Sequence, residues 1–130
     1  MSKAVLKTIK ESMKEIGINY QFKKWKGHPV YPYFVGSYQE VPNLLEDGMQ
    51  EISFILTGFA RSDGKVDGVL QLEDAKEAIK NYFDTGKIAI TDSGSAVAIF
   101  YANTFGDLPT GDAELEKIEI NLTIKEWRVK

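Results

Sequence analysis

Few side chains in this chain of 130 residues lie in a sequence context that would make them reactive. His28 is the only histidine, so any imidazole base or histidine metal site would have to use it. It lies between Gly27 and Pro29 in a sequence typical of a turn, which favours a structural or solvent-exposed role. Cysteine is absent, which excludes disulfides, thiolate metal sites and cysteine nucleophiles. No carboxylate pair has a context that suggests an acid and a base, so we expect no enzyme, cofactor or metal site.

The segment 63–68 (DGKVDG) shares acidic residues and glycines with calcium-binding loops. The register of such a loop fails here, because its first, third and twelfth ligand positions would fall on Phe59, Arg61 and Leu70. We therefore interpret the segment as two tight turns.

The charge of the chain argues against two classes of partner. The formal net charge is -3 and the pI is about 5.2, whereas binding to nucleic acid or to an anionic membrane needs a basic excess. The segment 22–26 (FKKWK) mixes cations with aromatic rings, but in an acidic chain we interpret it as a solvated strand edge. No apolar run reaches the length of about 20 residues that a membrane span needs. We thus expect neither sequence-specific nucleic acid nor a membrane as partner.

Apolar spacing predicts the order of the secondary structure. One helix is expected from Ser2 to Gly17 and a second around 72–83, because apolar residues recur there at helical intervals. Strands are expected near 18–22, 30–40, 51–61, 87–91, 96–101 and 117–125. The alternation of the last strand breaks at Glu126-Trp127, which indicates a bulge or the strand's end.

This order predicts a single domain over 1–130 of the α+β class, a largely antiparallel β-sheet with two α-helices packed on one face. The long strand 51–61 carries apolar groups on both faces, with Ile52, Phe54 and Leu56 on one side and Ile55, Thr57 and Phe59 on the other. Half of the sheet surface would then face water or a partner.

The segment 30–40 (VYPYFVGSYQE) concentrates aromatic residues in an extended stretch. Pro32 removes a backbone donor, which predicts a strand at or near a sheet edge, where another chain can pair. We expect this strand and the outer face of 51–61 to form a contact surface. Its candidate residues are Tyr31, Tyr33, Phe34, Tyr38, Ile55 and Phe59.

The order of elements, together with Tyr31-Pro32-Tyr33 and the strand Ser53 to Arg61 with the helix after it, resembles the tail-terminator or head-tail joining proteins of tailed phages and prophages. The resemblance implies a non-enzymatic subunit that closes into a ring, commonly a hexamer, at the end of the tail tube. Its implied partners are copies of itself, the tail-tube protein and the head connector or completion protein. The implied location is the bacterial host cytoplasm during assembly, then the head-tail junction of the virion tail.

Two further expectations concern ligands. In a ring, acidic loops could line a channel through which DNA passes without adhering, and the candidates are Glu46, Asp47, Asp107 and Asp112. The alternative function is a small-ligand-binding domain, in which Trp25 and the tyrosines at 31, 33 and 38 line an aromatic cleft.

Overall fold

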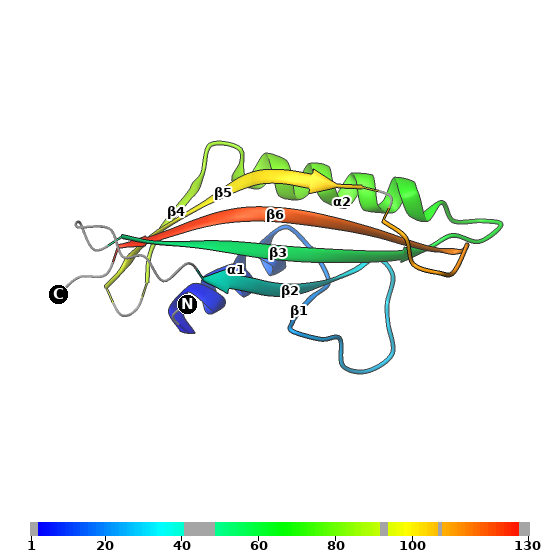
Figure 1. The fold of residues 1–130 in the computed structure, drawn as a ribbon, viewed down its shortest axis with the longest axis horizontal. Helices are drawn as coiled ribbons and strands as arrows, with labels where there is room; N and C mark the ends of the chain where they lie inside the picture. The colour runs from blue at the N-terminus through cyan, green and yellow to red at the C-terminus, as the bar shows by residue number, and fades with distance from the viewer. Residues whose placement is uncertain (1–2, 41–48, 92–93, 107, 128–130) are drawn as a thin grey trace.

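The computed structural model describes residues 3–40, 49–91, 94–106 and 108–127, which form two helices and six strands (Figure 1). In chain order these are α1 (Lys3–Glu15), β1 (Tyr20–Phe22), β2 (Tyr33–Glu40), β3 (Met49–Arg61), α2 (Gly68–Phe83), β4 (Lys87–Ile90), β5 (Ala96–Phe105) and β6 (Leu115–Trp127). The predicted order of helix, three strands, helix, hairpin and long final strand is confirmed.

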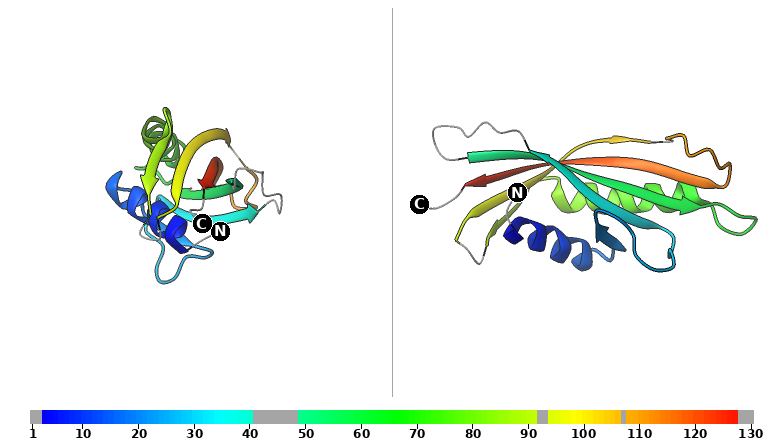
Figure 2. Two further views of the ribbon diagram at one scale, coloured as in Figure 1. Left: turned by 90° about the vertical axis from the view of Figure 1, so that its left-hand side faces the viewer. Right: turned by 60° about the horizontal axis from the view of Figure 1, so that its bottom comes forward.

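The six strands form one curled sheet in the order β1-β2-β3-β6-β5-β4. Every neighbouring pair is antiparallel except β1 and β2, which are parallel. Both helices pack on one side of the sheet, which we call the helix face, and their apolar residues share a single core with it (Figure 2). The predicted α+β fold is confirmed. We call the opposite side the open face.

Helix α1 forms because its apolar side chains recur every four residues, which buries Val5, Ile9 and Met13 against the sheet. The chain leaves the helix at Gly17, whose φ of 74° is a left-handed conformation that glycine adopts without a Cβ clash. The backbone N–H of Ile18 donates to the carbonyl of Met13 at 2.9 Å and closes the helix end. Glycine at 17 thus ends α1 where the sequence predicts.

Helix α2 begins earlier than its apolar spacing predicts, because Asp67 caps it. The carboxylate of Asp67 accepts hydrogen bonds from the backbone N–H groups of Val69 and Leu70. Upstream, the Asp63 carboxylate accepts hydrogen bonds from the backbone N–H groups of Lys65 and Val66, which lower its pKa. The segment therefore forms a turn and a helix cap from its two aspartates.

The core is built by the even-numbered residues of β3 and β6, which face the helices. Phe54 and Leu56 on β3 and Ile120 and Leu122 on β6 are essentially fully buried. Phe34 on β2 joins them and lies opposite Gly58. A Cβ on Gly58 would come within 2.3 Å of the Phe34 ring, so the glycine makes room for the phenyl group.

Buried polar groups link the end of β4 to the start of β5 and to β6. The hydroxyls of Thr91 and Ser95 lie 2.7 Å apart, and Ser95 Oγ donates to the buried Glu126 carboxylate at 3.0 Å. Glu126 keeps the alternation of β6, so the structure shows no bulge there, and the strand ends at Trp127 within the described residues, as the second of the two predicted outcomes states. The irregularity in register lies instead in β5, between Tyr101 and Asn103.

The close approach of Phe34 to Gly58 predicts a strong, local steric coupling. Gly58→Ala should lower the free energy of unfolding by about 1–3 kcal/mol, because the added methyl group overpacks a buried site. In a Phe34→Leu background the same substitution should cost markedly less, because the ring that it meets is gone. Urea unfolding of the four chains measures the coupling.

Gly64→Ala is the matched control, because no atom lies within 4 Å of its added Cβ. It should leave stability unchanged or raise it by at most about 1 kcal/mol. Equal costs of Gly58→Ala with and without the Phe34 ring would contradict the packing described.

Candidate functional site

Four aromatic rings gather on the open face at the end of the sheet where β3 ends. Tyr33 is their centre: its ring lies 4.8 Å from that of Trp25, 5.4 Å from that of Tyr31 and 5.1 Å from that of Phe59, measured between centroids. These separations are typical of favourable aromatic pairs. We call these four residues the aromatic cluster.

Strand register and one ordered loop position the cluster. Tyr33 lies directly opposite Phe59 in the β2–β3 ladder, so both rings project from the open face. Trp25 comes from the loop after β1, and its indole N–H donates to the backbone carbonyl of His28 at 3.2 Å. The loop is folded back by Gln21, whose side chain bonds both the backbone N–H and the carbonyl of Lys26.

Two cations from distant segments flank the rings. The guanidinium of Arg61 lies 5.7 Å from the ring centre of Tyr31, and the ammonium of Lys117 lies 5.9 Å from that of Phe59. Both are within the range of cation–π attraction. Burial raises the pKa of Tyr33, and the neighbouring Tyr31 adds to this, so its hydroxyl stays protonated at neutral pH.

A shallow depression of about 450 Å³ lies over the cluster. Trp25, Tyr33 and Phe59 line it together with Lys23 and Lys24. Its walls thus combine flat apolar rings with cationic groups. Such a surface can accept an apolar or aromatic group and attract a neighbouring negative charge.

The structure brings together three of the predicted contact residues, Tyr31, Tyr33 and Phe59. Ile55 lies on the same open face, four residues before Phe59 along β3, and is half-buried. Trp25, predicted only for the ligand-binding alternative, belongs to the cluster.

Two predicted contact residues lie elsewhere. Phe34 is 0 % exposed in the core beneath the helices, so its predicted role as a surface residue is wrong. Adjacent side chains of a strand point to opposite faces. Because Tyr33 projects from the open face, Phe34 must point into the core. Tyr38 is 40 % exposed but lies on the helix face, where its ring stacks on Phe22 at 5.9 Å, so it does not line a cleft with Tyr33.

Of the predicted channel-facing acidic residues, Glu46, Asp47 and Asp107 lie outside the described residues. Asp112 accepts a backbone hydrogen bond from Glu114 and pairs with Arg61 at 3.3 Å, and these contacts lower its pKa. Asp112 therefore helps to hold the guanidinium beside the cluster.

Arg61 and Lys117 are the site residues that sequence reasoning missed. Arg61 lies two residues after Phe59 on β3 and therefore on the same face, whereas Lys117 reaches the cluster only through the pairing of β3 with β6. The sequence carried one signal for Lys117. Aligning the apolar faces of the two long strands pairs Phe59 with Lys117 and so predicts their contact.

Comparisons of the chain with protein-family models and with curated proteins gave no match. No helix in the described ranges is long and apolar enough to cross a membrane. Within the same ranges, no group of three or more histidine, cysteine, aspartate or glutamate side chains is placed to hold a metal ion.

Because Tyr33 lies at the centre of the aromatic cluster, removal of its ring should expose the indole of Trp25 to water. In a Trp127→Phe background, which leaves Trp25 as the sole tryptophan, Tyr33→Ala should shift the fluorescence emission to longer wavelength because water reaches the indole. Stability should fall by about 1–3 kcal/mol, since three ring contacts are lost.

Tyr38→Ala in the same background is the control, because Tyr38 lies on the helix face. Its emission should match the background chain. Equal shifts in the two variants would show that Trp25 does not depend on the cluster.

Proposed function

We propose that the chain is a non-enzymatic assembly protein of a tailed phage or prophage, a tail-terminator-like subunit that forms a ring and joins the tail tube to the head connector. The observation that carries the proposal is the aromatic cluster, a set of half-exposed rings on the sheet face that neither described helix covers. Aromatic residues and arginine are enriched where proteins bind each other, and here they gather at one place.

A subunit that both contacts copies of itself and docks a partner needs more than one contact surface. The aromatic cluster lies where β3 ends, and a second apolar surface lies at the other end of the sheet on β4. There the side chains of Ile88 and Ile90 are each 72 % exposed, which makes them the most exposed large apolar residues among those described. Two separate apolar surfaces support this proposal, because β4 can contact another copy while the aromatic cluster docks a partner.

On this proposal the aromatic cluster docks a partner, the tail-tube protein or the head connector, and the flanking cations attract its acidic groups. Assembly takes place in the cytoplasm of the bacterial host, and the ring then resides at the head-tail junction.

A second candidate function is supported by the depression over the cluster. Its volume of about 450 Å³ lies within the range of small-molecule sites, and three aromatic residues line it. A small aromatic or anionic ligand would stack on Trp25 or Phe59 and pair with Lys23 or Lys24.

Light scattering and negative-stain imaging of the purified chain at micromolar concentration test the leading proposal. We expect a single ring-shaped species of several copies that binds the ends of tail tubes. A strictly monomeric chain that also ignores tail-tube protein would overturn the proposal.

The docking role of the cluster is tested in the same assay. Phe59→Ala should weaken binding of the tail-tube or connector protein at least about tenfold, a loss of about 1.4 kcal/mol or more. Val69→Ala is the matched control, because this exposed apolar residue lies on α2 and outside the cluster. Equal effects of the two variants would show that the cluster is not the docking surface.

Thermal melting in the presence of a metabolite panel tests the second candidate. A ligand of the depression should raise the melting temperature of the wild-type chain and leave that of Phe59→Ala unchanged. Rings without any ligand-dependent shift would favour the assembly role instead.

A further inference from the structure

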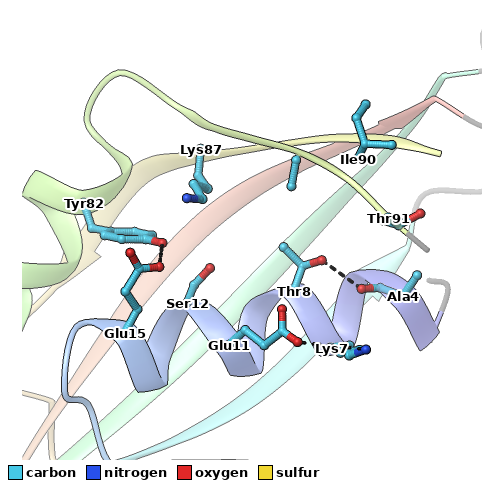
Figure 3. A pocket seen from close by; sticks show the side chains of 11 residues that line it. Ala4, Lys7, Thr8, Glu11, Ser12, Glu15, Tyr82, Lys87, Ile90 and Thr91 are labelled. Atoms are coloured by element: carbon cyan, nitrogen blue, oxygen red, sulfur yellow. Dashed lines mark hydrogen bonds and ion pairs between the residues drawn. The ribbon is translucent and has the colours of Figure 1, made fainter. Parts of the chain in front are cut away.

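Helix α1 carries a row of lysines on its outward side. They recur at helical intervals and are all exposed: Lys3, Lys7, Lys10 and Lys14. The two glutamates of the helix lie to one side of this row and line the cavity between α1 and β4, where Figure 3 shows Glu15 reaching the hydroxyl of Tyr82. Residues 1–26 hold seven of the fourteen lysines of the chain and only two of its nineteen carboxylates, so this part of an acidic chain is basic.

A hollow between α1 and β1 adjoins the lysine row, and we call it the α1–β1 groove. Its volume is about 570 Å³. The apolar side chains that line it are Leu6, Tyr20 and Phe22, and the charged ones are Lys7, Lys10 and Lys26. None of the described residues that line it carries a carboxylate. The groove is therefore complementary to an apolar side chain that has negative charges around it.

Helix α2 presents such a side chain on its outward side. Leu70 is 61 % exposed, and helical spacing places it opposite the buried side of the helix. Asp74 is exposed and lies one turn further along the same side, while Asp67 and Glu73 lie three residues before and after Leu70. Glu73 pairs with Lys76 at 2.6 Å, whereas no ion pair holds Asp74 within the described part of the chain. Leu70 is thus an apolar group surrounded by carboxylates.

One copy cannot bring its own Leu70 into its own groove. The C-terminal ends of α1 and α2 meet where the Tyr82 hydroxyl donates to the Glu15 carboxylate at 2.6 Å. From there the two helices run back in opposite directions (Figures 1 and 2). Leu70 precedes Tyr82 by about 18 Å along α2, at about 1.5 Å per residue. The first turn of α2 therefore lies away from the groove of the same copy, and only another copy can fill it.

We propose that the outward side of α2 in one copy packs against α1 and β1 of the next copy, with Leu70 in the α1–β1 groove. Asp74 then lies within the row of lysines on the neighbouring α1. The inference rests on the self-association proposed above and names its contact. The two surfaces are unlike, so the same contact can repeat from copy to copy, as it does in a ring.

The apolar and the charged parts of this contact have different roles. Exposed ion pairs contribute little to affinity, whereas an apolar side chain buried near the centre of an interface contributes much. Entry of Leu70 into the groove therefore supplies affinity. The carboxylates around it favour the lysine-lined groove over other apolar surfaces and speed the encounter. The aromatic cluster lies on the open face, so it stays accessible to a partner in the assembled particle.

Disulfide cross-linking tests the contact directly, because the chain has no cysteine of its own. An equal mixture of Leu70→Cys and Leu6→Cys chains, one of them with an affinity tag, should give mainly mixed dimers under mild oxidation. A disulfide forms only when the two Cα atoms come within about 7 Å. Val69→Cys in place of Leu70→Cys is the matched control, because Val69 is also exposed but lines a different hollow with Gly106. It should give at most about a tenth of the yield, and equal yields overturn the inference.

Charge reversal tests the same contact without a covalent bond. Lys10→Glu with Lys26→Glu should reduce self-association in light scattering at least about tenfold, and so should Asp74→Lys with Glu77→Lys. All four changes in one chain should restore assembly, because the charges are then complementary again. Leu70→Ser should also lose assembly, whereas Val69→Ser should keep it. Melting curves confirm that each variant is folded.

The outcomes separate the contact from the proposed function. Assembly that survives both charge reversals and Leu70→Ser overturns the inference and leaves the proposed function standing. Assembly that is lost in Ile88→Ser but kept in Leu70→Ser places the contact between copies on β4, which also overturns the inference. A two-copy particle that needs both helices supports the contact and overturns the ring. A wild-type chain that stays monomeric overturns both.

Discussion

The antiparallel pairing of β3 with β6, thirteen residues on each strand, is the constraint on which the rest of the structure depends. Because side chains alternate along a strand, this register places every even-numbered residue of both strands on the helix face and every odd-numbered residue on the open face. A slip of one residue would bury Lys117 and Lys125 beneath the helices. The pairing of β2 with β3 extends this division of faces, with Phe34 in the core and Tyr33 in the aromatic cluster outside it.

The parts of the fold that rest on local periodicity could be predicted from the sequence. The apolar residues of α1 recur at helical intervals, those of β6 alternate, and the structure confirms both elements. The start of α2 was missed because its first turn lacks an apolar pattern, and the Asp67 cap was the signal that could have placed it. Whether Tyr33 or Phe34 is buried depends on the register of β2 with β3. In the sequence this register was indicated only by Gly58, a residue small enough to leave room for a ring opposite it.

The candidate site could be predicted only in pieces. The segments 22–26 and 30–40 stood out by composition, yet their shared position required the loop after β1 to fold back over β2. Phe59 and Arg61 join them through the pairing of β2 with β3, and Lys117 joins through the pairing of β3 with β6. Long-range pairing of this kind leaves no periodic trace within any one segment, which is why the cluster emerges only from the assembled sheet.

Strand β1 is only three residues long, and it is the one strand that runs parallel to its neighbour among the described strands. A parallel pair needs a connection that returns along its whole length, because the second strand begins beside the start of the first. Residues 23–32 make this return, and they carry Trp25 to within 4.8 Å of Tyr33, measured between ring centroids. The direction of the shortest strand is therefore what supplies the cluster with an aromatic side chain from outside the sheet.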